Sequence, residues 1–328
     1  MQWSCPMYRK LGLLVIAAVL LQGCATYVEH RLSSRVEPMG MPANMPEIIT
    51  DTGGQFREFC LPHLGGCTKY IYAPSTTERQ EQSFKFTAVF EDATKEYVLD
   101  LNRQQIPEVR RGTMIMLHGY GGNKETMYFL AEYYRFIGFH VIIPDLKGHG
   151  ESSHEQPGLA VNDVEMIHNL INSLPGRERP HPLFITGYSM GAVAAVHVAR
   201  QRNDISGLVL LAPMRQFEDA VYEVTKMTNK TAVKIISEDS IREGARNTLL
   251  KNDIEAEALD LHQILPPLKV PTLVLASERD SVAPFSYFQP LGSRYVEVKE
   301  IPDRHHFLMA IMDPKMHEYL YPWLQRRR

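Results

Sequence analysis

Continuous apolar runs alternate with helical stretches along most of this chain, and this alternation is its main structural signal. We expect the apolar runs to form strands at Thr113–Leu117, Phe139–Ile143, Pro182–Thr186, Leu208–Leu211, Thr272–Leu275 and Tyr295–Val298. Helices are expected from about Lys124 to Phe136, from about Gly158 to Leu174 and from Ala192 to Arg200. Strands that are apolar throughout are buried on both faces, as in parallel sheets. The pattern therefore predicts an α/β fold with a mostly parallel, doubly wound sheet.

The segments before the first of these strands have a different character. Phe84–Phe90 and Tyr97–Leu101 alternate apolar and polar residues around a turn, which predicts an antiparallel pair at a sheet edge. Residues 25–58 carry prolines, glycines and methionines with no clear period, which favours a tether. We therefore expect a tether with a cysteine loop over residues 24–80 and the folded domain over residues 81–328.

Residues 214–268 contain no strand-like run, although they interrupt the series of strands. Phe217–Met227 and Ala245–Leu250 have helical patterns. An insert at this point lies above the carboxyl ends of the strands, where ligands bind in such sheets. The segment therefore predicts a helical cap, and the alternative is a structural excursion that covers nothing. Its apolar side chains are expected either to form the cap's own core or to line an apolar pocket; they are Met227, Ile235, Ile236, Leu249 and Leu259.

The N-terminus is typical of a targeting segment. Arg9 and Lys10 precede the apolar run Leu11–Leu21, which is short for a membrane span and fits the core of a signal peptide. The run ends in Leu21-Gln22-Gly23-Cys24, which resembles the bacterial lipobox. That resemblance implies cleavage after residue 23, lipidation of Cys24 and anchoring in the cell envelope. With alanine after Cys24 it implies the outer membrane, with the protein facing the periplasm. The alternatives are an ordinary secretory signal and an uncleaved anchor.

Composition and cysteine content narrow the picture further. The chain has 328 residues, 44% of them hydrophobic, which suits a large globular core. Its formal net charge of −3 gives no electrostatic support for nucleic-acid binding. In an oxidising envelope, Cys60 and Cys67 are expected to form a disulfide. The alternative is a metal site, but with His63 these cysteines supply only three ligands.

The pentapeptide Gly187-Tyr188-Ser189-Met190-Gly191 has the pattern G-x-S-x-G between a predicted strand and a predicted helix. That context is typical of a nucleophile elbow, in which a sharp turn exposes a serine at the end of a strand. The glycines are needed because the turn is tight and its flanks approach closely. Ser189 is therefore the candidate nucleophile, and the alternative is a bystander serine in a glycine-rich turn.

A serine hydroxyl needs a neutral imidazole to take its proton and a carboxylate to hold that imidazole. Asp280 lies in the turn after the strand Thr272–Leu275 and is the candidate acid, unless it only caps the following helix; Glu278 is expected to be a solvated neighbour. After the last strand, His305 and His306 both qualify as the base, and only one is expected to reach the serine.

Two backbone amides are candidates for an oxyanion hole. One belongs to Met190, directly after the nucleophile. The other belongs to Tyr120, in the glycine-rich loop His118-Gly119-Tyr120-Gly121-Gly122-Asn123. The side chain of His118 is expected to be a buried scaffold rather than a catalyst.

Taken in order, these motifs resemble the α/β-hydrolase family over about residues 80–325, and they are most similar to its serine esterases, lysophospholipases and monoacylglycerol lipases. The motif Asp145-Leu146-Lys147-Gly148-His149-Gly150-Glu151-Ser152 contributes to the likeness, although family members often have arginine where Lys147 stands. His306 falls on the family's histidine, with the common phenylalanine after it, so the resemblance favours His306 over His305. Residues 25–80 have no counterpart in it.

The resemblance implies an α/β-hydrolase fold with a helical cap. It also implies ester hydrolysis through Ser189, His306 and Asp280 by way of an acyl-enzyme, with no metal or organic cofactor. The expected substrates are small-molecule or lipid esters such as lysophospholipids or monoacylglycerols, and the expected membrane contact is through Cys24. The alternatives are a thioesterase, peptidase or carbon–carbon hydrolase on the same scaffold, and a non-catalytic binding lipoprotein.

Overall fold

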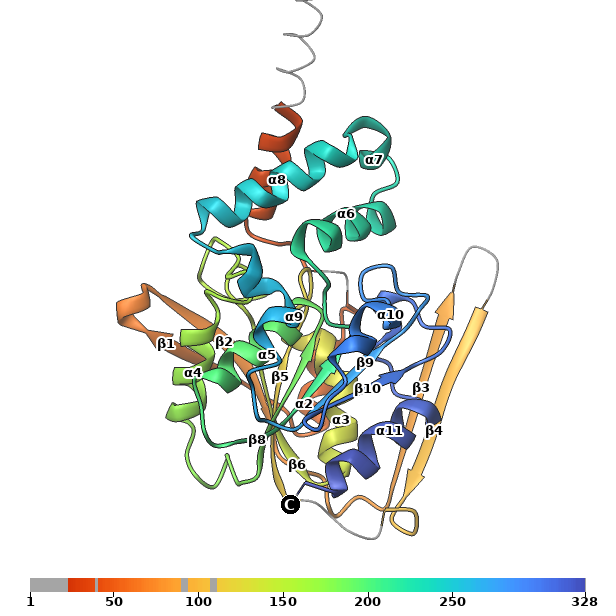
Figure 1. Cartoon of the computed structure of the whole chain (residues 1–328). Coiled ribbons are helices and arrows are strands. Elements are labelled where there is room, and N and C mark those ends of the chain that lie inside the picture. Colours follow the sequence, from red (N-terminus) through yellow and green to blue (C-terminus); the bar gives the residue numbers. More distant parts are fainter. Residues whose placement is uncertain (1–22, 39–40, 90–93, 107–110, 328) are drawn as a thin grey trace, which may run out of the picture.

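The computed structural model describes residues 23–38, 41–89, 94–106 and 111–327, so the predicted signal peptide lies outside the described residues except for Gly23. An eight-stranded sheet forms the centre, in the order β1-β2-β6-β5-β7-β8-β9-β10 (Figure 1). Its strands are β1 (Gln55–Leu61), β2 (Gly66–Ala73), β5 (Gly112–Leu117), β6 (Phe139–Pro144), β7 (Leu183–Tyr188), β8 (Ile205–Leu211), β9 (Thr272–Ala276) and β10 (Val296–Glu300). From β6 to β10 all neighbours are parallel. This confirms the predicted α/β-hydrolase architecture.

Helices cover both faces of this sheet. Helices α4 and α5 lie on one face and α3 and α11 on the other (Figure 1). The α-helices are α2 (Met45–Asp51), α3 (Tyr128–Phe136), α4 (Val164–Ser173), α5 (Met190–Arg200), α6 (Phe217–Thr228), α7 (Ala232–Ile235), α8 (Glu238–Lys251), α9 (Leu261–Ile264), α10 (Phe285–Phe288) and α11 (Pro314–Gln325). The short 3₁₀ helices are η1 (Pro62–Leu64), η2 (Lys124–Met127), η3 (Ala256–Leu259), η4 (Gln289–Leu291) and η5 (His306–Leu308). Residues 23–32 are also helical.

Helix α4 begins six residues later than the sequence predicted, at Val164 rather than near Gly158. Leu159 and Ala160 have positive φ angles of 49° and 68°, which a right-handed helix does not allow. The Asp163 carboxylate holds this turn by accepting hydrogen bonds from the amides of Lys147 and Ala160.

The tether predicted for residues 25–58, and the domain boundary near residue 81, are wrong. Strand β2 pairs with β6 from Tyr70 opposite Pro144 to Ala73 opposite Val141, and β1 pairs with β2 at the edge of the same sheet. Strand β1 is mostly exposed on both faces, so its sequence needs no clear apolar period. The hydrolase fold therefore begins well before residue 81.

Strands β3 (Glu81–Val89) and β4 (Thr94–Asn102) form the expected antiparallel pair, but as a separate two-stranded sheet rather than an edge of the main one. One face of this hairpin is exposed and the other is turned inward. Ala88 and Tyr97 on the inward face pack against Leu308, which directly follows the segment of the two candidate histidines.

Helices α6 to α9 fill the interval between β8 and β9, where the cap was expected. The amide of Arg215 donates to the carbonyl of Val282, and the Met227 sulfur lies 3.8 Å from the hydroxyl of Ser281. Both contacts join the cap to the loop after β9, at the carboxyl end of the sheet. Among the described residues, no helix combines the length and apolar character needed to cross a bilayer.

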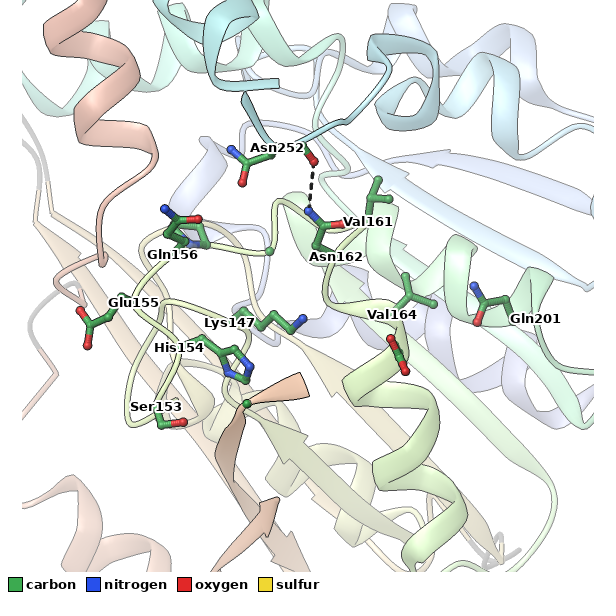
Figure 2. A pocket seen from close by; sticks show the side chains of 14 residues that line it. Lys147, Ser153, His154, Glu155, Gln156, Val161, Asn162, Val164, Gln201 and Asn252 are labelled. Atoms are coloured by element: carbon green, nitrogen blue, oxygen red, sulfur yellow. Dashed lines mark hydrogen bonds between the residues drawn. The ribbon is translucent and has the colours of Figure 1, made fainter. Parts of the chain in front are cut away.

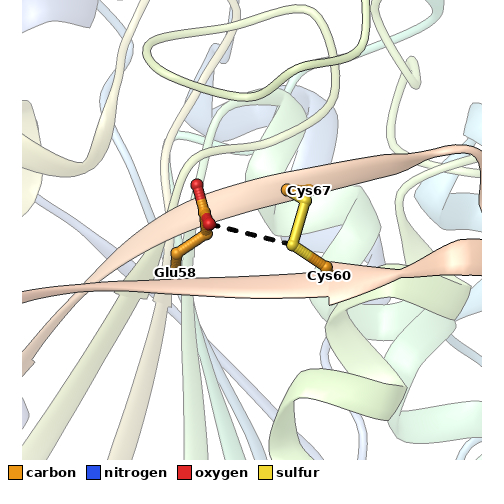
Figure 3. A group of neighbouring side chains, drawn as sticks. All are labelled: Glu58, Cys60 and Cys67. Atoms are coloured by element: carbon orange, nitrogen blue, oxygen red, sulfur yellow. Dashed lines mark hydrogen bonds between the residues drawn. A yellow bond between two sulfur atoms is a disulfide. The ribbon is translucent and has the colours of Figure 1, made fainter.

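A disulfide joins Cys60 and Cys67, which lie opposite each other in the β1–β2 hairpin (Figure 3). Glu58 lies beside the bridge, but both sulfur atoms are oxidised and so are not thiolate ligands for a metal. His63 instead contacts Glu165, with its Nε2 2.9 Å from the carboxylate.

Replacing both bridging cysteines by serine is expected to lower the free energy of unfolding by about 2–3 kcal/mol, because the open chain regains loop entropy when it unfolds. Urea denaturation of Cys60→Ser/Cys67→Ser against the parent protein measures this difference. Cys24→Ser is the matched control, since Cys24 forms no disulfide. Equal stability of the double variant and the control would show that the bridge contributes nothing.

Candidate active site

Ser189 occupies a strained turn between β7 and α5. Its φ and ψ angles are 53° and −118°, which few non-glycine residues adopt. A Cβ on Gly187 would collide with the carbonyl of Gly191 and the backbone of Ala192, and a Cβ on Gly191 would collide with the carbonyl of Leu117. The two glycines therefore permit the close approach that the sequence predicted for a nucleophile elbow.

The structure brings Ser189, His306 and Asp280 into one hydrogen-bonded chain. His306 Nε2 lies 2.9 Å from Ser189 Oγ, and His306 Nδ1 lies 2.8 Å from Asp280 Oδ2. All three side chains are buried, with exposed fractions of 7%, 2% and 1% for the serine, histidine and aspartate. Since a carboxylate only accepts, Nδ1 carries a proton and donates a hydrogen bond to Asp280 Oδ2. Nε2 is then free to accept the proton of the serine hydroxyl.

Local contacts fix the orientation of the acid and distinguish the two histidines. Asp280 Oδ1 accepts hydrogen bonds from the amides of Val282 and Ala283 at 2.9 and 3.0 Å, so the carboxylate both caps the turn and faces His306. His305 lies on the exposed side of its segment, whereas His306 points to the elbow. Glu278 accepts hydrogen bonds from Ser286 at the surface, away from this chain of contacts.

The glycine-rich loop after β5 lies directly against the elbow. A Cβ on Gly119 would approach the Cβ of Ser189 to 3.0 Å, so only glycine fits there without displacement. His118 holds the loop in place: its Nδ1 donates to the carbonyl of Gly119, and its Nε2 accepts from the amide of Leu146. Tyr120 is the residue after Gly119 in this loop. Met190 is the first residue of α5, where helix amides have no intrahelical acceptor. The two predicted oxyanion donors thus belong to the two segments that flank Ser189.

Burial holds two further imidazoles neutral beside the glycine-rich loop. Desolvation lowers the pKa of His118 to about 4 and that of His149 to about 3, with the nearby His118 adding to the effect on His149. Burial also raises the pKa of Asp163, to about 6. These three groups therefore bind protons differently in the folded and unfolded chains.

We expect the free energy of unfolding to rise as the pH rises from about 4 to about 6.5. In this window the unfolded chain binds a proton on each imidazole that the folded chain does not bind. Protonation therefore favours unfolding, and raising the pH increases the free energy of unfolding by about 1.4 kcal/mol per pH unit for each histidine. Asp163 acts in the opposite direction below about pH 6, because there its folded form holds the extra proton. Urea denaturation across this range, for the parent and for His149→Gln, measures the slope. A slope that is unchanged by the substitution would contradict this assignment.

Arg304 and Tyr188 hold the segment that carries His306, and the sequence does not predict this role for either residue. The buried guanidinium of Arg304 donates to the carbonyls of Leu308 and Ile311, both at 2.6 Å, and pairs with Asp313 at 2.5 Å. It also lies over the ring of Tyr97 on β4, 4.6 Å from the ring centroid. These contacts join Arg304 to residues that are far away in the sequence or irregularly spaced along it, so no sequence pattern predicts them.

Tyr188 reaches the same segment from the elbow. Its hydroxyl donates to the carbonyl of His306 at 2.9 Å, and its ring lies 5.2 Å from the imidazole centroid. The residue before the serine therefore connects the nucleophile's strand directly to the backbone of His306.

A cavity of about 640 Å³ lies elsewhere, between the loop around residues 153–165 and the end of α8 (Figure 2). Lys147 and His154 line it, and the side-chain amide of Asn162 donates to the carbonyl of Asn252 across its rim. Ser189, His306 and Asp280 are not among its lining residues. This cavity is therefore separate from the chain of contacts at Ser189.

Comparisons with known proteins point to the same class of enzyme. Residues 108–259 match the family described as serine aminopeptidase, S33. The chain is 25% identical over 219 residues to a thermostable monoacylglycerol lipase of Bacillus sp. (strain H-257), covering 62% of this chain and 86% of the lipase.

Solved structures share the fold over most of the chain. An esterase of Pyrococcus furiosus superposes with a TM-score of 0.58 at 16% identity, covering 90% of this chain and 99% of the esterase. A bacterial membrane phospholipase A superposes with a TM-score of 0.56 at 17% identity, covering 98% of both chains.

The fold and the elbow define an α/β-hydrolase. More particularly, the chain is a serine hydrolase of the α/β-hydrolase type, similar to esterases and lipases.

Proposed function

We propose that this chain is a lipid-anchored carboxylic ester hydrolase that works through Ser189, His306 and Asp280. The observation that supports this best is the continuous chain of contacts at 2.9 and 2.8 Å from Ser189 Oγ through His306 to Asp280. Ser189 attacks the ester carbonyl while His306 Nε2 takes its proton, and His306 then returns that proton to the departing alcohol. Water, activated by the same imidazole, hydrolyses the acyl-enzyme and restores the serine.

The negative charge that forms on the carbonyl oxygen would be stabilised by the amides of Tyr120 and Met190. Their position on either side of Ser189 supports this role, since Gly119 packs against the serine and Met190 begins α5. The first turn of a helix also favours negative charge through its unsatisfied amides.

Monoacylglycerols or lysophospholipids are the substrates we propose. This proposal rests on the similarity to a monoacylglycerol lipase and on the lipobox at Cys24, which would hold the enzyme beside membrane lipids. Hydrolysis rates for esters of graded acyl length, a thioester and a peptide anilide test it with the purified protein. We expect the highest kcat/KM on an acyl ester. A higher kcat/KM on the thioester or on the anilide would contradict the proposal and identify the protein as a thioesterase or a peptidase. Absence of turnover on every substrate would favour a non-catalytic binding lipoprotein.

We also propose that Cys24 carries lipid and holds the protein in the outer membrane, facing the periplasm. The sequence Leu21-Gln22-Gly23-Cys24 supports this. Cells grown with a labelled fatty acid are expected to label the parent protein and not Cys24→Ser. Equal labelling of both would contradict the lipid site.

Arg304 is expected to act as a positioning residue for His306. Removing its contacts in Arg304→Gln frees the segment, and a displacement of about 1 Å can reduce kcat by roughly 100-fold with little change in KM. Arg304→Lys keeps the charge beside Asp313 and is expected to recover part of that loss. Kinetics of both variants, after circular dichroism has shown that they fold, measure the effect.

Arg279→Gln is the matched control, because Arg279 pairs with Asp303 at the exposed surface. Equal kcat for Arg304→Gln and Arg279→Gln would show that Arg304 has no positioning role.

A further inference from the structure

The N-terminal helix, residues 23–32, packs against the cap rather than against the sheet domain alone. Ala25 is buried, and a Cβ on Gly244 of α8 would come within 2.5 Å of the Val28 side chain and 2.6 Å of the Ala25 carbonyl. Glu29 and Lys251 add an ion pair at 2.6 Å. Figure 1 shows this helix lying beside α8 at the end of the molecule that is furthest from the C-terminus.

Because of these contacts, no linker separates Cys24 from the residues that pack against the cap. The first packed residue is Ala25, directly after the proposed lipid site, and Val28 follows about one helical turn later, or roughly 5 Å along the axis. A lipid on Cys24 would therefore keep α8 close to the bilayer surface. The tether that the sequence predicted for residues 25–58 would have fixed neither the distance nor the orientation of the cap relative to the membrane.

The tip of the cap, residues 226–235, has a surface suited to lipid headgroups. Lys226, Lys230 and Lys234 are exposed there, and Lys226 also forms an ion pair with Glu223 at 3.1 Å. Ile235 is 75% exposed, although the sequence placed it in the cap's interior. Lysines around an exposed apolar side chain favour the interface of an anionic membrane. In Figure 1 the tip, which includes α7, lies toward the same end as the N-terminal helix.

We propose that the cap rests on anionic lipid headgroups, with the N-terminal helix and the tip (residues 226–235) as its two points of contact. This proposal depends on the lipid anchor of the proposed function and specifies where the enzyme meets its lipid substrate. The helix fixes the cap near the bilayer, and the lysines and Ile235 set its orientation. The path from membrane to Ser189 then begins at the cap.

Depth measurements on the lipidated full chain in vesicles test the orientation. A fluorescent thiol label on Ile235→Cys is expected to be quenched at least about threefold more by nitroxide-bearing lipid than the same label on Lys315→Cys, which lies on α11. The difference is expected in vesicles that contain phosphatidylglycerol and to shrink when Lys230→Glu/Lys234→Glu is added. Equal quenching at the two labels, or no effect of the two lysine substitutions, would overturn the proposal.

Gly244→Ala tests the helix contact without harming α8 itself, because alanine favours a helix interior more than glycine does. Its Cβ is expected to displace the N-terminal helix. We expect hydrolysis of a lipid ester packed in vesicles to fall at least about tenfold, with hydrolysis of a soluble short-chain ester unchanged. Glu243→Ala, at an exposed neighbouring position on α8, is the matched control.

Equal rates of Gly244→Ala and Glu243→Ala on the packed lipid would contradict the coupling of helix and cap. If the parent protein hydrolysed neither ester, the proposed function would fail, and the depth measurement would still decide the orientation.

Discussion

Ser189→Ala is expected to reduce kcat/KM for ester hydrolysis by roughly 10⁴- to 10⁶-fold, since the oxyanion donors and the substrate site alone give only weak catalysis. The substitution removes the hydroxyl that lies 2.9 Å from His306 and leaves the elbow's backbone unchanged. Hydrolysis of short p-nitrophenyl esters by parent and variant measures the loss. Ser293→Ala, at an exposed position in the loop before β10, is the control and is expected to retain full activity. Full activity in Ser189→Ala would show that another group attacks the ester.

Asp280→Asn is expected to lower kcat by about 10⁴-fold by reversing the tautomer of His306. Oδ1 of Asp280 already accepts two backbone amides, so the side-chain oxygen of asparagine keeps that position. Its NH₂ group then faces His306 Nδ1 and donates to it, which leaves Nε2 protonated and unable to take the serine proton. The fold is expected to survive, because the turn keeps both amide contacts.

Steady-state kinetics of Asp280→Asn and Glu278→Gln test this argument. Glu278 lies on the same loop and loses the same charge, but its carboxylate accepts hydrogen bonds from Ser286 at the surface rather than from His306. We expect Glu278→Gln to resemble the parent. A similar, small loss in both variants would show that Asp280 acts through charge or stability rather than through the orientation of His306.

The parallel sheet and the elbow could be predicted from sequence because their signals are local. Strand β5 is buried at every residue, and its last four residues, Met114 to Leu117, are all apolar. The requirement for glycine at positions 187 and 191 arises within the turn itself and its nearest neighbours. The acid and the base could also be predicted, because each lies in the loop after a strand that the apolar pattern identifies.

The N-terminal third of the fold could not be predicted in the same way. Strand β1 shows little burial on either face, and α2 has only seven residues, so neither has a strong period. Strand β2 pairs with β6, which lies about seventy residues further along the sequence. A local pattern cannot predict such a pairing. The contacts of Ala25 and Val28 with Gly244 of α8 join residues that are even further apart in the sequence.

The supports of His306 show a different limit. Arg304 acts through two carbonyls, an aspartate and an aromatic ring on a hairpin, and a lone arginine in a loop gives no sign of such contacts. Tyr188 is part of the elbow motif, so its position was evident from the sequence. Its hydrogen bond to the His306 carbonyl was not, because it depends on how two strands that are distant in the sequence align. Sequence therefore names the reacting groups more readily than the groups that hold them.

Mass spectrometry of the intact protein and of its proteolytic peptides, after reaction with a fluorophosphonate, tests the central claim most directly, because only an activated serine is phosphonylated. We expect a single adduct on the peptide that contains Ser189, and its rate of formation should fall sharply in His306→Ala while His305→Ala reacts like the parent. An unreactive parent protein, or an adduct on a different serine, would contradict the assignment of Ser189 and His306 as the reacting pair.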